Sequence, residues 1–238
     1  MTYRRIITGL ALVCAAALLQ SPAWAARIAI IGTGEVAGAL GPEFAALGHQ
    51  IVYGSRDPAR PEVRDLVARS GTNASAVSQS DAVAGADIVV LAVPGGVAEQ
   101  LARSLGNLAG KIVIDPTNRV GRGDDGWLIH DVPGKGSNAE LIQAALPDAY
   151  VVKAFNTLNW RTMVDPEDSG GPVTIAIAGN NEAAKATVVE LIEGMGLQSV
   201  DFGPLRYAHV LEEMLIVWAN ARGRGAAFNY YLRPQPAD

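Results

Sequence analysis

The stretch "RIAIIGTGEVAGAL", residues 27–40, determines which fold this chain can adopt. It begins with a short β-branched run that ends in glycine, and it continues with small and apolar residues at helical spacing. Within it, Gly32, Gly34 and Ala37 follow the pattern G-x-G-x-x-A between a strand and a helix. Gly32 permits the tight turn, Gly34 lets a pyrophosphate approach the backbone, and Ala37 lets the helix pack closely. The stretch therefore predicts a dinucleotide-binding site at the start of the helix.

The rest of the chain alternates between apolar strands and amphipathic helices. Further strands are expected at 50–55, 86–94, 110–117, 149–156 and 173–179. Residues 118–138 are the one long irregular stretch, and a last helix is expected at about 204–222. Continuous apolar strands between helices indicate a parallel sheet covered on both faces. We expect an α/β, Rossmann-type, doubly wound fold with a mainly parallel sheet and a small C-terminal helical extension.

Composition limits the number of domains and the kinds of partner. The chain has 238 residues, of which 49% are hydrophobic and 18% charged, which suits one globular domain. We expect one nucleotide-binding domain at 26–238, with its C-terminal helical part at about 204–238. The net charge is −5 and no basic stripe is present, so the sequence gives no support to nucleic-acid binding.

The first 25 residues have the pattern of a signal peptide. "MTYRR" is basic, "IITGLALVCAAALLQ" is apolar, and "SPAWA" ends in small residues, so cleavage is expected after Ala25. The apolar run of about 14 residues is shorter than the roughly 20 of a membrane span. We expect a periplasmic or secreted protein with no stable membrane insertion after cleavage. The alternatives are a core helix or anchor, or a start codon assigned too early for a cytoplasmic protein beginning near Ala26.

The stretch "YGSRDPAR", residues 53–60, predicts which nucleotide binds. NAD-binding domains carry an acidic residue near this point for the ribose 2′-hydroxyl. Here Ser55 can donate a hydroxyl, Arg56 can form a charge-assisted pair with a phosphate, and Arg60 adds a second contact. Asp57 is expected to cap a helix and point away. The cofactor predicted is NADP rather than NAD, and the alternative is that these arginines are only solvated surface residues.

Six segments of the chain also carry a family resemblance. They are "IIGTGEVAGAL", "GHQIVYGSRDP", "ADIVVLAVPGG", "GKIVIDPTN", "SNAELIQAALPDAYVVKAFNTL" and "DFGPL". From about residue 27 to about residue 220 the sequence resembles the NADPH-dependent coenzyme F420 reductases, also called deazaflavin:NADP oxidoreductases. The first three segments occur more widely among NADP enzymes, whereas the last two are more specific in combination. A signal peptide is a departure from this family, because nicotinamide cofactors and the usual deazaflavin partner are cytosolic.

The resemblance implies a set of cofactor-binding residues and an electron acceptor. The pyrophosphate and ribose would contact Gly32, Thr33, Gly34, Glu35 and Val36, and the 2′-phosphate would contact Ser55, Arg56 and Arg60. The path to the nicotinamide would be lined by Val93, Pro94 and Gly95, and the nicotinamide would be flanked by Ala154, Phe155 and Asn156, with Trp160 nearby. The implied acceptor is a deazaflavin stacked on the nicotinamide, and related domains pass hydride to an ordinary flavin instead.

Catalytic side chains are not expected, because hydride transfer between two bound rings is mainly a positioning problem. His49 has a structural role as its main interpretation, and His130 could meet a substrate from the long loop. His209 lies near Glu212 and Glu213 at helical spacing, but a metal site would need a third ligand, so no metal is predicted.

Other readings of the function stay open. The first is a reductase for another small substrate, such as a hydroxyacid dehydrogenase or a pyrroline-carboxylate reductase. Those proteins have a longer helical second domain, and the hydroxyacid dehydrogenases use a helix-borne lysine, whereas no lysine follows residue 185 here. The second is an exported NADP-binding module without turnover.

The segment "HVLEEMLIVWANA", residues 209–221, predicts a homodimer. Its apolar side chains form an arc that looks too wide for one packing face. The arc consists of Val210, Leu211, Met214, Leu215, Val217 and Trp218. A second apolar strip would be costly to leave in water, and a two-fold mate would cover it. The alternative is that the strip packs under the long loop.

Overall fold

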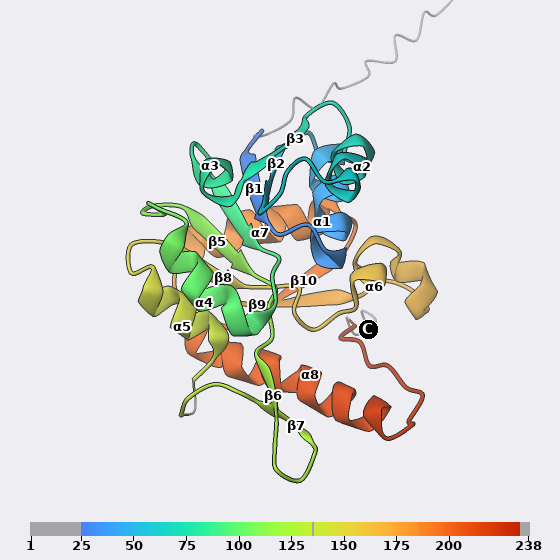
Figure 1. Cartoon of the computed structure of the whole chain (residues 1–238). Coiled ribbons are helices and arrows are strands. Elements are labelled where there is room, and N and C mark those ends of the chain that lie inside the picture. The colour runs from blue at the N-terminus through green and yellow to red at the C-terminus, as the bar shows by residue number, and fades with distance from the viewer. Residues whose placement is uncertain (1–24, 135, 234–238) are drawn as a thin grey trace, which may run out of the picture.

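The computed structural model describes residues 25–134 and 136–233, so the expected signal peptide at 1–25 lies almost wholly outside the described residues. One eight-stranded sheet crosses the molecule in the order β10-β9-β8-β5-β4-β1-β2-β3 (Figure 1). Its strands are β1 (Arg27–Ile31), β2 (Gln50–Ser55), β3 (Ala74–Ser78), β4 (Ile88–Leu91), β5 (Ile112–Asp115), β8 (Tyr150–Lys153), β9 (Thr174–Gly179) and β10 (Gln198–Asp201). A separate hairpin consists of β6 (Val120–Arg122) and β7 (Leu128–His130).

Helices follow most strands. They are α1 (Glu35–Ala46), α2 (Pro61–Arg69), α3 (Gln79–Val83), α4 (Gly95–Ser104), α5 (Asn138–Ala145), α6 (Trp160–Val164), α7 (Glu182–Gly194) and α8 (Ala208–Gly223), with short 3-10 turns η1 (Pro166–Ser169) and η2 (Leu205–Tyr207). Among the described residues no helix is long and apolar enough to cross a membrane.

The sheet is mainly parallel, as the sequence predicts. β1 pairs in parallel with both β2 and β4, and Ile30 stands level with Tyr53 on one side and Val90 on the other. Only the β8–β9 pair is antiparallel. The carboxyl ends of β1, β2, β4, β5 and β8 therefore meet at one edge, which is where open α/β sheets bind their ligands.

Both faces of the sheet are buried, because alternate residues of each strand enter opposite cores. From β1, Ile28 and Ile30 pack with residues of α1, α6 and α7 on one face. Ala29 and Ile31 pack with residues of α3, α4 and α5 on the other face. This two-sided burial explains why the strands read as continuous apolar runs.

The long stretch at 118–138 is more ordered than expected. It contains the β6–β7 hairpin, which lies along α8 at the bottom of Figure 1. The side chain of Asn220 on α8 accepts from Leu128 N and donates to Leu128 O, both at 2.8 Å. The hairpin is attached to α8 through the side-chain amide of Asn220, and no local sequence pattern predicts this contact. The strands β3 and β10 were also not expected.

The C-terminal segment 226–233 returns along the molecule beside α8. Thr174 N donates to Leu232 O at 2.9 Å, so the segment adds a backbone contact at the amino end of β9. Trp218 Nε1 donates to Asn229 Oδ1 at 2.9 Å, and the Tyr230 hydroxyl donates to Met214 O. These bonds cover the side of α8 that carries Trp218.

This covering narrows the surface that was predicted to form a dimer. Leu211 is buried, and Met214 packs against it. Trp218 is only partly exposed and contacts the C-terminal segment. Val210 and Val217 remain exposed, at 42% and 64%. The exposed apolar strip of α8 therefore consists of two valines, and Trp218 is not part of it.

Candidate cofactor and acceptor site

A cavity of about 980 Å³ lies at the carboxyl ends of β1, β2 and β4. This volume is at the upper end of the roughly 300–1,000 Å³ of ligand sites, so it suits a dinucleotide better than a single ring. It is lined by Gly32, Thr33, Gly34, Gly54, Ser55, Arg56, Asp57, Arg60, Gln79, Ala92, Val93, Pro94, Val97, Gln100, Leu101 and Ser104. We call it the nucleotide cavity.

The two glycines of the β1–α1 turn are required for different reasons. Gly32 has a φ of +115°, and a Cβ there would lie 2.1 Å from the carbonyl oxygen of Ala92. Gly34 has an ordinary extended backbone, and a Cβ there would meet no atom within 4 Å. Nothing in the described protein excludes a side chain at Gly34, which is exposed toward the cavity. This open space fits a group that approaches the backbone from outside, as a pyrophosphate does.

The residues after β2 surround the end of the nucleotide cavity that would hold a 2′-phosphate. Arg56 and Arg60 are exposed, and Arg60 Nη2 donates to Thr33 Oγ1 at 3.2 Å, so its guanidinium crosses to the β1–α1 turn. Ser55 is 5% exposed, and its Oγ accepts from Asp57 N, which leaves its hydroxyl hydrogen to donate. Asp57 Oδ1 accepts from Ala59 N at 3.1 Å.

The role expected for Asp57 is therefore wrong in one detail. Its carboxylate caps a turn, and the helix α2 begins only at Pro61. The side chain still has an internal partner, so it does not oppose an anion as a free carboxylate would.

The predicted nicotinamide-side residues separate into two groups. Val93 and Pro94 line the nucleotide cavity, whereas Gly95 does not. A Cβ on Gly95 would lie 2.3 Å from Asn118 O, so this glycine lets the start of α4 pack against the segment after β5. Glu35, one of the residues expected to contact the pyrophosphate or the ribose, is exposed in the first turn of α1. Gly95 thus has a packing role that the family pattern alone does not reveal.

Ala154, Phe155 and Asn156 follow β8, and none of them is among the residues that line the nucleotide cavity. Ala154 and Phe155 are buried, and the Phe155 ring packs edge-on against Phe44 in the core. Phe155 has a φ of 64°, unusual for a non-glycine residue, and such strain is typical of functional sites.

The turn at Phe155 sends the next side chain back into the protein. Asn156 Nδ2 donates to Asn118 Oδ1 at 2.9 Å and to Leu211 O at 2.8 Å. Asn118 Nδ2 in turn donates to Asn156 O at 2.9 Å. The reciprocal amide pair ties the ends of β5 and β8 together and to α8.

A second cavity of about 220 Å³ is bordered by the start of α1, the segment after β8, α8 and the C-terminal segment. It is lined by Val36, Thr157, Leu158, Asn159, Trp160, Leu215, Trp218, Asn229, Tyr230 and Tyr231. Val36 follows the β1–α1 turn that lines the nucleotide cavity, and Thr157 follows Asn156. We call it the aromatic cavity. Trp160, which the resemblance placed near the nicotinamide, is part of its lining.

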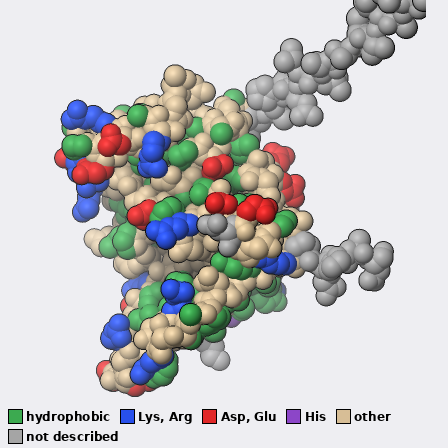
Figure 2. All heavy atoms as spheres, turned by 90° about the vertical axis from the view of Figure 1, so that its right-hand side faces the viewer, with side chains coloured by type: hydrophobic (Ala, Val, Ile, Leu, Met, Phe, Trp, Pro, Cys, Tyr) green, Lys and Arg blue, Asp and Glu red, His purple; other side chains and the backbone are tan. Residues whose placement is uncertain are grey.

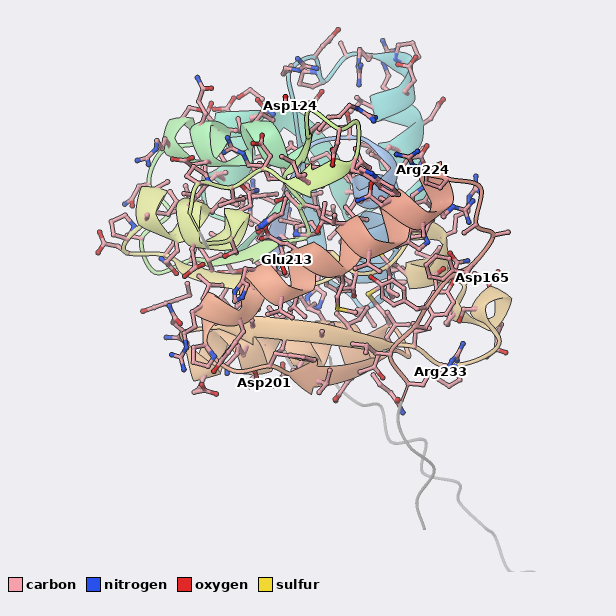
Figure 3. All side chains as sticks on the ribbon, turned by 90° about the horizontal axis from the view of Figure 1, so that it is seen from below. Asp124, Asp165, Asp201, Glu213, Arg224 and Arg233 are labelled. Atoms are coloured by element: carbon pink, nitrogen blue, oxygen red, sulfur yellow. The ribbon has the colours of Figure 1, made fainter. Side chains whose placement is uncertain are left out.

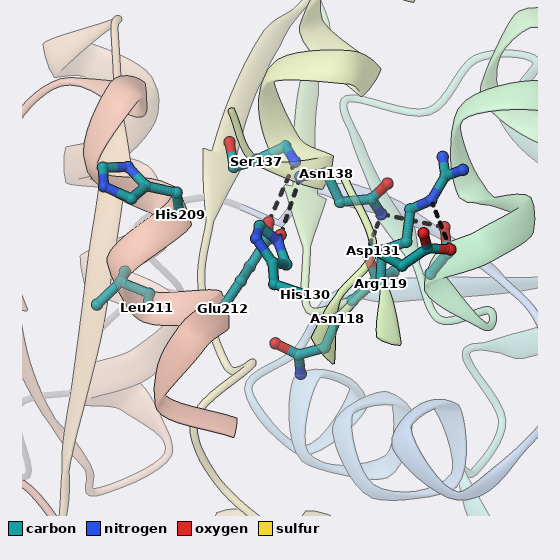
Figure 4. Close-up of polar contacts among 12 residues, drawn as sticks. Asn118, Arg119, His130, Asp131, Ser137, Asn138, His209, Leu211 and Glu212 are labelled. Atoms are coloured by element: carbon teal, nitrogen blue, oxygen red, sulfur yellow. Dashed lines mark hydrogen bonds and ion pairs between the residues drawn. The ribbon is translucent and has the colours of Figure 1, made fainter. Parts of the chain in front are cut away.

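A buried charged cluster joins the C-terminal helix to the carboxyl edge of the sheet, and Figure 4 shows its Glu212 beside His130 and Asn138. Lys153 Nζ lies 2.9 Å from Asp115 Oδ2 and 2.7 Å from Glu212 Oε1, and all three side chains are fully buried. Lys153 also donates to Thr117 O. His130 Nε2 of the hairpin lies 2.7 Å from Glu212 Oε2. The carboxylate of Glu212 therefore links α8 to both β8 and the β6–β7 hairpin.

Glu212 also caps α5. It accepts from Asn138 N at 2.9 Å and from Ala139 N at 3.2 Å, the first amides of that helix. Burial alone would raise the pKa of Glu212, but the Lys153 ammonium and these hydrogen bonds hold the pKa below its ordinary value. The carboxylate is thus charged at neutral pH.

The histidines have structural partners. Ala26 N donates to His49 Nδ1 at 3.1 Å, and burial lowers the pKa of His49. His130 contacts Glu212 rather than a substrate cavity, and His209 Nδ1 lies 2.6 Å from Arg206 O. In the described part of the chain no group of three or more His, Cys, Asp or Glu side chains is arranged for a metal ion.

Sequence reasoning missed the charged cluster. Asp115 and Lys153 stand in the quoted segments "GKIVIDPTN" and "VVKAFNTL", but no role was assigned to either. The available signal was a charged residue at the end of an apolar strand, where burial requires a partner. It also missed Gln79, Gln100 and Ser104 of the nucleotide cavity, because polar residues on helices carry no such signal.

Comparisons with known proteins place the chain in a family. Residues 27–119 match the family described as NADP oxidoreductase coenzyme F420-dependent. The F420-dependent NADP reductase of Methanothermobacter thermautotrophicus is 28% identical over 213 residues, which cover 83% of this chain and 90% of that protein. Metalloreductase STEAP3 of Rattus norvegicus is 31% identical over 196 residues, and this chain spans only 37% of its length.

Comparison with solved structures also supports this family. A crystal structure from Arthrobacter sp. FB24, described as a "putative f420 dependent nadp-reductase", is 32% identical with a TM-score of 0.79, and the match covers 89% of this chain and all of that one. A reductive aminase from Aspergillus terreus in complex with NADPH, 18% identical with a TM-score of 0.59, shares the fold. The chain belongs to the family of coenzyme F420-dependent NADP oxidoreductases.

Proposed function

We propose that this protein transfers a hydride between NADPH and a flavin-type acceptor, either a deazaflavin or a flavin. The observation that carries the proposal is the aromatic cavity beside the nucleotide-binding turn. Four of its ten lining residues are Trp or Tyr, and a planar ring system binds to such side chains by stacking. One relative also supports it by name, the F420-dependent NADP reductase.

The chain contributes position rather than a reacting group. NADPH, when bound, supplies the hydride, and together with one proton from solvent it converts the oxidised acceptor ring to its reduced form. Residues of the nucleotide cavity would hold the phosphates, and Asn156 ties the chain after β8 to Asn118 and to Leu211 of α8. Val36, two residues after Gly34, lines the aromatic cavity, so an acceptor ring there would lie beside the nucleotide-binding turn, and hydride transfer would need the two rings within about 3–3.5 Å.

Some hydrogen-bonding groups of the aromatic cavity already have partners within the protein. Asn229 Oδ1 accepts from Trp218 Nε1, Asn159 Oδ1 accepts from Arg161 N, and the Tyr230 hydroxyl donates to Met214 O. Burial raises the pKa of Tyr230, so its phenol is neutral at physiological pH. The cavity has four aromatic side chains and no charged one, so it favours a ligand recognised by its flat face over a small anionic ketoacid.

A turnover assay with NADPH and a panel of acceptors tests the proposal. We expect oxidation of NADPH at 340 nm with flavin or deazaflavin, and little with ketoacids or imines. Trp160→Leu should raise the KM for the ring acceptor and leave NADPH affinity unchanged. Trp127→Leu is the matched control, because Trp127 is exposed on the hairpin and lies outside the cavity. NADPH binding without turnover of any ring acceptor would refute the proposal and favour a binding module.

A further inference from the structure

Three arginines stack on aromatic residues that line the aromatic cavity. Each guanidinium stacks on an aromatic residue of the cavity lining: Arg161 over Trp160 at 4.9 Å, Arg222 over Trp218 at 5.3 Å, and Arg233 over Tyr231 at 5.7 Å from the ring centroids. All three arginines are exposed. We call them the arginine rim. None of them forms an ion pair with another residue that the structure describes.

The size and lining of the cavity separate a ring from its side chain. Its volume of about 220 Å³ is below the roughly 300 Å³ at which sites for whole drug-sized ligands begin. None of its lining residues is charged. A planar ring can enter, but a ribityl or longer side chain must leave the cavity. Any charged group on that side chain then lies near the arginine rim.

The three arginines differ in how many of their guanidinium N–H groups remain free to donate hydrogen bonds. Arg233 donates to Pro172 O at 2.8 Å and to Ser169 O, so it contributes mainly charge. Arg161 and Arg222 make no side-chain hydrogen bond to the described residues, and their planar N–H forks suit a phosphate. Both are held by stacking, which reduces the entropy that they lose on binding.

Acidic residues also occur on this face. Asp165 and Glu167 follow α6, and Figure 3 shows Asp165 on the same side of the molecule as Arg233. In Figure 2 basic side chains lie both at the upper left and on the lower lobe, with several acidic ones between them. Arg222 has Trp218 and Ala219 one turn earlier on α8, so no carboxylate of its own helix neutralises it there.

We propose that the arginine rim selects acceptors whose ring carries a phosphate-ester side chain over the same ring without phosphate. This inference rests on the proposed function and names the substrate class of the same site. The aromatic cavity recognises the ring, and Arg161 and Arg222 recognise the phosphate oxygens outside it.

The test compares FMN with riboflavin, which have the same ring and differ in one phosphate. At low ionic strength we expect the KM for FMN to be about tenfold lower, and the difference to shrink with added salt because exposed charges are screened. Quenching of tryptophan fluorescence by each flavin, measured with NADP present, reports binding without turnover. The same comparison with coenzyme F420 and its chromophore lacking the phosphate shows which ring is preferred.

Variants decide which residues are responsible. Arg161→Gln with Arg222→Gln should raise the KM for FMN to that for riboflavin, and Arg222→Lys should keep part of the preference. Arg206→Gln is the matched control, because Arg206 stacks on Tyr207 at 4.9 Å away from the cavity. Equal KM values for FMN and riboflavin in the wild type would overturn the inference and leave the proposed function standing. Failure to bind or reduce either ring would overturn both.

Discussion

Gly32 and Gly34 lie in the same turn, and the structure predicts opposite consequences of substituting them. A methyl group on Gly32 would lie 2.1 Å from Ala92 O and 3.3 Å from Val93 Cγ1, at a φ of +115°. Both the backbone strain and the displacement of β4 oppose folding. We expect Gly32→Ala to lower the free energy of unfolding by about 3–5 kcal/mol.

Gly34→Val should leave the fold nearly intact. A Cβ at this position meets nothing within 4 Å, and the φ of −89° is allowed for valine. Because Gly34 is the N-cap of α1, replacing it costs at most about 1 kcal/mol. NADPH should nevertheless bind at least about tenfold more weakly, since a branched side chain removes one or more charge-assisted hydrogen bonds of about 1.5–3 kcal/mol each.

Two titrations of the purified variants measure these effects. Urea unfolding gives the stability of each variant, and NADPH fluorescence gives its affinity. Wild-type NADPH affinity in Gly34→Val would show that the pyrophosphate lies elsewhere. A loss of stability in Gly34→Val as large as that in Gly32→Ala would contradict the open space at Gly34.

Four further outcomes are expected. Arg56→Ala should lower NADPH affinity by about 1.5–3 kcal/mol and leave NADH affinity nearly unchanged, and equal losses in paired titrations would refute the 2′-phosphate contact. Glu212→Gln should lower the free energy of unfolding by about 3 kcal/mol at pH 7. Because the folded pKa of Glu212 lies below its ordinary 4.5, the wild type has this stability fully above pH 4.5 and loses it as the pH falls through the lowered pKa. Unfolding curves at several pH values should show this acid loss in the wild type and not in the variant. If α8 forms a dimer interface, Val217→Asp should give a monomer by light scattering, and a wild-type mass near one chain would remove the premise. If the N-terminus is a signal peptide, N-terminal sequencing of protein from its native cell should begin near Ala26, and an intact Met1 would contradict export.

The nucleotide-binding half of the fold could be predicted because its signals are local. The β1–α1 turn needs glycine at one position for a φ of +115° and at another for open space, and both lie within a few residues of a buried strand. Such requirements concern residues that are neighbours in the sequence, so a short motif reveals them. The same holds for Ser55 and Arg56 at the end of β2.

The edge strands β3 and β10 could not be predicted, because their side chains are not fully buried and their sequences therefore contain no apolar run. β3 reads "ASAVS" and β10 reads "QSVD", and in neither is any residue fully buried. A strand at the edge of a sheet packs against one neighbour and tolerates small polar residues, so no apolar run forms. Their pairing with β2 and β9 is decided by the strands inside the sheet.

Phe155 shows that a family motif can indicate a residue near a ligand site without giving the orientation of its side chain. The family pattern places it at the nicotinamide, yet its ring packs on Phe44 in the core. The φ of 64° at this residue sets that orientation, and a positive φ in a non-glycine residue is rarely visible in sequence.

The buried cluster explains how α8 can form part of a cofactor-dependent site although it lies far along the chain from the nucleotide turn. Glu212 binds Lys153 and the first amides of α5 at the same time, so α8 cannot shift without leaving a buried ammonium unpaired. Leu215 and Trp218 of the same helix line the aromatic cavity and are thereby fixed relative to β8. The C-terminal segment is held mainly by single hydrogen bonds and completes the cavity with Tyr230 and Tyr231. Differences in acceptor choice between relatives should therefore arise in this segment and in the arginines beside it, while the helix behind it stays in place.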